Sequence, residues 1–257
     1  MNDSFIAEGI SSVSALINNT LYGHSNSKRR ITDVYFDISK IAKYDRTSYG
    51  RYRFLKENAN KCEYNFHECT ADTISEMTDG NTHGGIAASV TYGGIDYLQP
   101  DALKKDSFYC FLDGVDDPYN LGYIIRTMYT FGASGIILPE NNKMNMFPST
   151  VIKSAAGLTE CMDIFISRPD DVCNIFKSIG YRIACAALRD SVSSCNADLK
   201  HPILLVIGGE KRGISRQILS QSDINIRIDY AIDFKGSLPS VSAASVLGYE
   251  INKQNSK

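Results

Sequence analysis

Three places in the chain put glycine or polar residues behind an apolar run that predicts a buried strand. "PILLVIGGEKRG" contains Gly208 and Gly209 and continues with Glu210. The loop "DYAIDFKGSLPS" follows a predicted strand ending at Ile228, and "AALRD" follows another. Ligands of open α/β sheets bind outside the carboxyl ends of the strands, so these places are candidate sites. Two residues without side chains would admit either a flat ligand or another stretch of backbone.

A single arginine interrupts an otherwise apolar helical pattern in "DDPYNLGYIIRTMYTFG". Five apolar residues recur at helical spacing and form one stripe: Leu121, Ile124, Ile125, Met128 and Phe131. Arg126 falls roughly 160° from the centre of that stripe, so the pattern predicts an outward-facing guanidinium. Asn120 stands where an N-cap is expected, and Gly132 stands where a left-handed glycine would end the helix. Such an arginine is an ordinary surface charge unless the rest of the chain gives it a partner.

The last of the three loops leads into a helix that should pack closely on a neighbour. Pro239 stands in the first turn of this helix, with a serine available as its cap. Ser240, Ala244 and Gly248 then recur every four residues. This ridge of small residues lets another helix or loop approach closely.

The motifs of several common enzyme classes are absent from the sequence. No G-x-G-x-x-G opens a helix after the first strand, which counts against nicotinamide enzymes and ordinary Rossmann methyltransferases. No Walker A, H-E-x-x-H or G-x-S-x-G stretch occurs either. One set of possible metal ligands matches no standard zinc spacing, so no metal is expected; the set is Cys62, His67, Cys69 and His83.

Hydrophobic periodicity predicts an α/β protein in two parts. We expect a small α/β domain over 1–92, a linker over 93–106 and a larger domain over 107–257. The order of elements in the small domain is predicted as αβαβαβ. The linker has glycines, a proline and no clear period. Beyond it, short apolar runs alternate with helices, as in a mostly parallel sheet covered on both faces.

Composition limits the classes of partner. The chain has 43% hydrophobic and 22% charged residues, which is typical of a soluble globular protein. No apolar run approaches the ~20 residues of a membrane span, and the N-terminus does not have the features of a signal peptide, so a cytoplasmic location is expected. The cysteines in apolar stretches are expected to be buried free thiols; these are Cys110, Cys173 and Cys185.

Any contact with a polyanion must be local, because Lys+Arg 27 against Asp+Glu 29 gives a net charge of -2. "KRR" and "RTSYGRYRFLK" are the local candidates. Basic groups interleaved with aromatic rings suit phosphate neutralisation and stacking on unpaired bases, although a solvated helix face would have the same composition.

Three longer stretches, in this order and spacing, resemble the signature motifs of the SpoU/TrmH branch of the SPOUT RNA methyltransferases. They are "FLDGVDDPYNLGYIIRTMYTFGASGIILP", "LLVIGGEKRGIS" and "IRIDYAIDFKGSLPSVSAASVLGYE". The resemblance covers the chain from about Ser107 to its end, and the preceding part is similar to the small substrate-binding domain of the two-domain members. It implies a trefoil knot in the C-terminal domain, a homodimer and S-adenosylmethionine as the cofactor.

By this resemblance the chain is a 2'-O-ribose methyltransferase of structured RNA, with 23S-type ribosomal RNA preferred and no DNA or membrane partner expected. The implied catalytic set is Arg126, Asn120, Glu210 and Ser240. The implied cofactor-binding set is Leu188, Ile207, Gly208, Gly209, Ile228, Ser237 and Leu238. The set expected to contact RNA is Lys28, Arg29, Arg30, Arg51, Arg53, Lys153 and Arg212. Arg126 would orient a ribose hydroxyl and stabilise developing charge, because an arginine stays protonated in ordinary surroundings.

The third stretch departs from the family pattern S-L-N-V-S-V-A. Pro239 stands where the asparagine is usual, and Val241 stands where the second serine is usual. Ser240 or Ser242 is the expected source of the missing side-chain contact. The alternatives are a tRNA 2'-O-methyltransferase, an RNA-binding member without catalysis, and a flavodoxin-like or other α/β protein that binds a small molecule.

Overall fold

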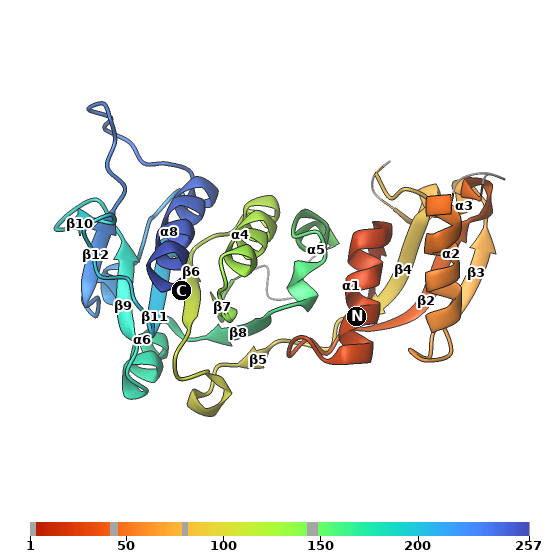
Figure 1. Cartoon of the computed structure of the whole chain (residues 1–257), viewed down its shortest axis with the longest axis horizontal. Coiled ribbons are helices and arrows are strands. Elements are labelled where there is room, and N and C mark those ends of the chain that lie inside the picture. Colours follow the sequence, from red (N-terminus) through yellow and green to blue (C-terminus); the bar gives the residue numbers. More distant parts are fainter. Residues whose placement is uncertain (1–3, 42–45, 79–81, 143–148, 257) are drawn as a thin grey trace.

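Two sheets lie side by side along the length of the molecule (Figure 1), one from each part of the chain. The computed structural model describes residues 4–41, 46–78, 82–142 and 149–256. The predicted α/β class is confirmed.

The N-terminal sheet has the strand order β1-β4-β2-β3. Its strands are β1 (Ser4–Glu8), β2 (Arg30–Asp37), β3 (Asn65–Cys69) and β4 (Ile86–Thr91). Its helices are α1 (Gly9–Tyr22), η1 (Ile38–Lys40), α2 (Arg46–Asn58) and α3 (Ala71–Met77). The order is therefore βαβαβαβ, and the prediction of αβαβαβ missed β1. This strand runs into α1 without an intervening turn, so its short pattern merges with that of the helix.

The second sheet has eight strands in the order β10-β12-β9-β11-β6-β7-β8-β5, and the recorded neighbours are parallel. The strands are β5 (Asp96–Tyr97), β6 (Phe108–Asp113), β7 (Gly135–Pro139), β8 (Asp163–Ser167), β9 (Arg182–Ala186), β10 (Val192–Ser193), β11 (Ile203–Gly208) and β12 (Ile224–Arg227). The helical segments are η2 (Pro100–Ala102), α4 (Pro118–Thr130), α5 (Ser149–Ser154), η3 (Leu158–Glu160), α6 (Pro169–Ser178), α7 (Arg216–Leu219) and α8 (Ser240–Asn255).

Helices cover both faces of the large sheet. Side chains of β6 alternate between two cores, with Phe108 and Cys110 facing α4 and α8 and Tyr109 and Phe111 facing α6 and α7. Alternation of this kind is what a strand inside a three-layer arrangement requires. The three cysteines predicted to be buried free thiols are confirmed as such.

The stretch expected to link the two parts, 93–106, contributes to the large sheet. Its strand β5 pairs with β8 at the sheet edge. Leu98 and Leu103 are buried in the core that faces α6 and α7. Two paired residues are too short to produce a period, so the sequence did not reveal this strand.

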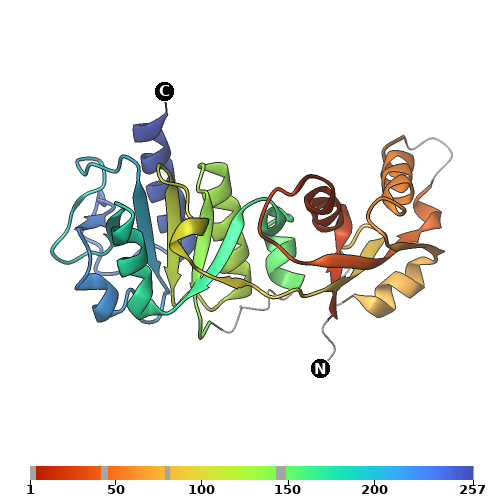
Figure 2. The same cartoon turned by 90° about the horizontal axis from the view of Figure 1, so that it is seen from below.

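A polar interface joins the two units, with α1 lying beside α5 (Figure 2). Arg29 is 6% exposed and forms an ion pair with the fully buried Glu160. Lys153 pairs with Glu8 across the same boundary. Arg29 and Lys153 were expected at an RNA surface, but these pairs turn them toward the protein itself. Because the sequence gives no sign of which units meet, it could not distinguish such pairing from a free charge.

Candidate active site

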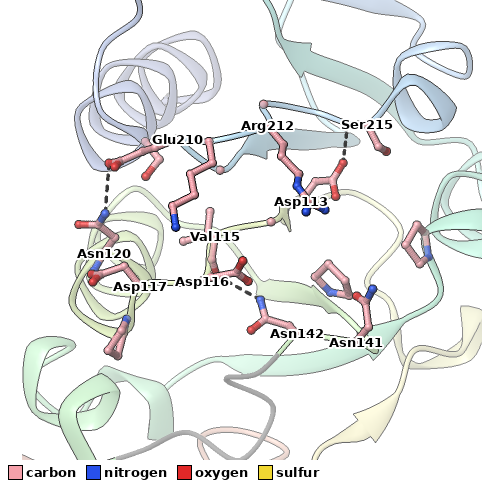
Figure 3. Close-up of a pocket in the computed structure, with 18 of the residues that line it drawn as sticks. Asp113, Val115, Asp116, Asp117, Asn120, Asn141, Asn142, Glu210, Arg212 and Ser215 are labelled. Carbon is pink, nitrogen blue, oxygen red and sulfur yellow. Dashed lines mark hydrogen bonds between the residues drawn. The ribbon is translucent and has the colours of Figure 1, made fainter.

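A cavity of about 970 Å³ opens at the carboxyl end of β6. Its wall includes the loops after β6, β7 and β11, the first turn of α4 and the starts of α6, α7 and α8 (Figure 3). Because the strands are parallel, their carboxyl ends meet at one edge and bring these segments together. Asn120, Gly209, Glu210, Arg212 and Ser240 of the predicted sets line this cavity.

The first turn of α4 is capped by Asp117, whose carboxylate accepts from the backbone N–H of Asn120 over 2.8 Å. The prediction that Asn120 itself is the cap is wrong, because Pro118 begins the helix two residues earlier. The amide of Asn120 is therefore free to act elsewhere. It donates to the Glu210 carboxylate over 3.2 Å (Figure 3).

The two glycines at the end of β11, Gly208 and Gly209, make room for backbone. A Cβ atom on Gly208 would lie 2.4 Å from the carbonyl carbon of Gly213, and one on Gly209 would lie 1.8 Å from the oxygen of Gly114. The loop folds back on itself, with the N–H of Gly213 donating to the Gly209 carbonyl over 2.9 Å. The sequence left open whether these glycines make room for a flat ligand or for another stretch of backbone. The structure shows another stretch of backbone.

Asp113 anchors this loop to the end of β6. Its carbonyl accepts from the N–H of Gly209 over 2.9 Å, and its carboxylate accepts from the N–H of Ser215 over 2.7 Å. Both ends of the loop are therefore tied to one residue of the neighbouring strand.

Two hydroxyl groups in the cavity wall have no hydrogen-bond partner in the described part of the chain. The Oγ atoms of Ser215 and Ser240 are buried, and Ser240 as a whole is 5% exposed. Ser240 opens α8 after Pro239, and no side chain caps this helix, so the predicted serine cap is wrong. Buried hydroxyls without partners are costly, so both are available to a ligand. Ser242 is exposed and does not line the cavity.

Arg126 lies outside this cavity. Its side chain is exposed and makes no hydrogen bond or ion pair with the residues that the structure describes. The predicted helix and its outward arginine are confirmed, since Leu121, Ile124, Ile125 and Met128 are fully buried on the opposite face. The structure of a single chain thus does not bring Arg126 together with Asn120 and Glu210.

Arg126 belongs to an exposed aromatic face on α4 and α8. Tyr123 and Tyr129 of α4 are 45% and 41% exposed, and Val246 and Tyr249 of α8 are 42% and 55% exposed. The two helices pack against each other, and a Cβ on Gly248 would lie 3.0 Å from the ring of Phe131. The ridge of small residues on α8 is therefore a contact surface for α4, as the sequence predicted.

Gly122, one turn before Arg126, has a packing role that the sequence did not reveal. A Cβ on this residue would lie 1.9 Å from the Ser154 hydroxyl and 2.7 Å from the Val151 carbonyl. Only glycine allows α5 to approach α4 this closely.

Three of the predicted cofactor-binding residues lie at the carboxyl ends of neighbouring strands. Leu188 follows β9, Gly208 ends β11 and Ile228 follows β12, and these strands are adjacent in the sheet. Leu188 is 51% exposed, whereas the side chain of Ile207 is buried in the core. The loop from β12 to α8, which holds Ser237 and Leu238, projects from the body (Figure 1). Within it the N–H of Leu238 donates to the Tyr230 hydroxyl over 3.1 Å.

The remaining residues expected to contact RNA differ in their surroundings. Lys28 pairs with Asp96, and Arg53 pairs with Glu57 on the same helix. Arg30, Arg51 and Arg212 are exposed. Arg30 donates to a backbone carbonyl, and Arg212 lies in the cavity wall.

The cavity carries more negative than positive side chains. Its carboxylates are those of Asp113, Asp116, Asp117 and Glu210, and its cations are Lys211 and Arg212. Within the described ranges, no group of three or more His, Cys, Asp or Glu side chains is arranged to hold a metal ion. No described helix is long and apolar enough to cross a membrane.

Comparisons with known proteins match both the sequence and the fold. Residues 107–249 match the model of the SpoU rRNA Methylase family. A protein of Staphylococcus saprophyticus assigned to the TrmH family of tRNA/rRNA methyltransferases is 28% identical over 83% of this chain and 87% of its own length. The AdoMet-bound rRNA methyltransferase of Sinorhizobium meliloti is similar with a TM-score of 0.77 and 21% identity, over 98% of this chain and 87% of that chain. A solved RNA 2'-O ribose methyltransferase is similar with a TM-score of 0.76 and 15% identity, over 98% of this chain and 89% of that chain.

Proposed function

The chain belongs to the SpoU rRNA methylase family and is an S-adenosylmethionine-dependent RNA methyltransferase, and from this premise we propose that it methylates the 2'-hydroxyl of a ribose in structured RNA. Ribosomal RNA is the proposed substrate ahead of tRNA. The small N-terminal sheet supports this choice, because the rRNA methyltransferase of Sinorhizobium meliloti shares the fold over 98% of this chain.

One observation supports the proposed site more than any other. Asn120, Glu210 and Ser240 come from three separate segments and line one cavity at the carboxyl edge of a parallel sheet. The neighbouring strand ends of β9, β11 and β12 form the proposed cofactor cradle at the same edge. The orphaned hydroxyl of Ser240 and the excess of carboxylates suit the positively charged sulfonium end of S-adenosylmethionine.

Bound S-adenosylmethionine supplies an activated methyl group. In the proposed reaction a bond forms between the ribose 2'-oxygen and the methyl carbon, the bond from that carbon to sulfur breaks, and S-adenosylhomocysteine leaves. The hydroxyl proton passes to solvent or to a carboxylate of the site. The residues of this chain hold the hydroxyl in line and stabilise the charge that develops on it.

Arg126 enters this scheme from a second copy of the chain. Its guanidinium has no partner in the described structure and sits on the exposed aromatic face of α4 and α8. Burying that face in a homodimer would remove apolar surface from water and could bring Arg126 to the partner's cavity. The trefoil knot and the cytoplasmic location stay predictions.

The direct test is methyl transfer from radiolabelled S-adenosylmethionine to unmodified transcripts of ribosomal RNA and of tRNA. We expect label in ribosomal RNA and, after digestion, in a 2'-O-methylated nucleotide. Label in a base would contradict the ribose assignment, and label in tRNA alone would contradict the preferred substrate. Tight RNA binding without transfer would favour an RNA-binding member that has lost catalysis.

A further inference from the structure

The cavity extends beyond the side where Asn120 and Glu210 lie. Figure 3 shows Asn141 and Ser215 on the opposite side, with Asp113 and Arg212 between them and Asn120. At about 970 Å³ the cavity is at the upper end of the range of roughly 300–1,000 Å³ for small-molecule sites. It is therefore larger than the sulfonium end of a cofactor and one ribose would need.

Four residues form this second end of the cavity: Pro139, Asn141, Pro169 and Gln217. The sheet brings the first three together, since Pro139 pairs with Ser167 in register and the chain enters α6 two residues later. Gln217 joins them because α7 packs against α6. The fold therefore brings these four residues together.

The side-chain amides of Asn141 and Gln217 have no hydrogen-bond partner among the residues that the structure describes. Both residues are exposed at the cavity wall, and neither side chain makes a hydrogen bond within the part of the chain that the structure describes. Asn142, by contrast, is 6% exposed and donates to the Val115 carbonyl over 3.1 Å. An amide offers both a donor and an acceptor, which is what reading the edge of a nucleic-acid base requires.

The charge of the cavity argues against a phosphate group as its occupant. Four carboxylates face two cations there, so a phosphate group would meet net repulsion. A base carries no charge, and Pro139 and Pro169 offer its faces apolar contact. The phosphates on either side of the nucleotide would remain outside, in water.

We propose that the end of the cavity formed by Pro139, Asn141, Pro169 and Gln217 holds the unpaired base of the nucleotide whose ribose is methylated, and that Asn141 and Gln217 read its edge. This inference rests on the proposed function for the position of the ribose. It adds two residues that determine which nucleotide is accepted, and it requires the target base to leave its stack or helix before reaction.

The kinetic test begins by mapping the nucleotide that the wild-type protein methylates. Transcripts with each of the other three bases at that position are then compared by kcat/KM. We expect the wild type to prefer one base by on the order of 10-fold or more, and Asn141→Ala and Gln217→Ala to lose most of that preference. Gln217→Glu, which removes the donor but keeps the size, should change the order of preference. Asn174→Ala, an exposed amide on α6 that does not line this cavity, is the matched control.

A binding test does not depend on methyl transfer. The side-chain amide NMR signals of Asn141 and Gln217, assigned by their loss in the alanine variants, are followed while adenosine, guanosine, cytidine and uridine are added in the presence of S-adenosylhomocysteine. Shifts at these two signals and none at Asn174 would support the base site even if no methyl group is transferred. Wild-type transfer with equal rates for all four bases, or variants with unchanged preference, would overturn it.

Discussion

The side chain of Asn120 donates to Glu210 over 3.2 Å and so joins the first turn of α4 to the loop after β11. The two residues are 90 positions apart in the sequence. The bond orients the Glu210 carboxylate at the mouth of the cavity, where we propose that the ribose lies.

Asn120→Ala and Glu210→Gln are each expected to lower kcat by roughly 10- to 100-fold, because each removes one partner of a positioned pair. The double variant should lose little more than the worse single variant, since contacting residues are not additive. Methyl-transfer kinetics on one RNA, with thermal unfolding to check the fold, measure this. If the loss of kcat in the double variant equals the product of the two single losses, the two residues act separately.

Mixed dimers test the proposed position of Arg126. Arg126→Ala and Glu210→Gln homodimers should each keep at most about a tenth of the wild-type activity, while S-adenosylhomocysteine affinity in Arg126→Ala stays close to that of the wild type. If Arg126 acts on the partner's cavity, a dimer of one variant with the other contains one intact site and regains up to about half of the wild-type activity. Co-purification through two different tags followed by transfer assays measures this. No recovery in mixed dimers would place Arg126 and Glu210 in the same chain's site.

Leu188→Glu is expected to weaken binding of S-adenosylhomocysteine by 10-fold or more, because a carboxylate would replace an apolar contact in the proposed cradle. Leu188 is 51% exposed, so its substitution should cost little stability. Tyr22→Glu, at a residue that is 68% exposed on α1, is the control. Calorimetry gives the affinities, and equal affinities in all three proteins would remove Leu188 from the cradle. Gly208→Val is less informative, since its side chain would strike the backbone at Gly213.

Arg29→Met is expected to destabilise the fold by about 3–5 kcal/mol, because it leaves the Glu160 charge buried without its partner. Combining it with Glu160→Leu should recover most of the loss. Lys28→Met breaks an exposed pair and should cost about 0–1 kcal/mol. Urea unfolding compares the three variants. An Arg29→Met protein no less stable than Lys28→Met would show that the buried pair contributes nothing.

Alkylation of the native protein should distinguish buried from exposed cysteines by their rates of reaction. Burial raises the pKa of Cys173 to about 11 and of Cys185 to about 12. Raised values keep these thiols protonated as pH increases, so at pH 8 fewer than about 1 in 1,000 would be thiolate. Mass spectrometry after brief treatment with iodoacetamide at pH 8 should find the exposed Cys195 modified and these two intact. In denaturant all the cysteines should react. Rapid labelling of Cys185 in the native protein would contradict this prediction and show that the sheet opens readily.

Residues whose burial follows from a periodic hydrophobic pattern were predictable from the sequence. The stripe on α4 required only the spacing of Leu121 to Met128, and the site followed from the rule that parallel strands end at one edge. Asp117, Asp113 and Ser215 were missed, although each follows a predicted strand or begins a helix. Their importance comes from particular hydrogen bonds across the sheet, which no local pattern encodes.

Pairings between distant segments were the main source of error. Arg29 looks like any surface arginine in the sequence, and its burial depends on Glu160, which is 131 positions away. The two glycines at the end of β11 were correctly identified as a point of close approach. The sequence could not show whether a ligand or another stretch of backbone packs against them. The structure shows that the backbone at Gly114 and Gly213 does so.

The two hydrogen bonds that Asp113 accepts from the N–H groups of Gly209 and Ser215 have a thermodynamic consequence. A loop that is already fixed loses its conformational entropy when the chain folds, so little remains to be lost when a ligand arrives. Substrate affinity at this rim should therefore depend more on desolvation and fit than on ordering of the polypeptide.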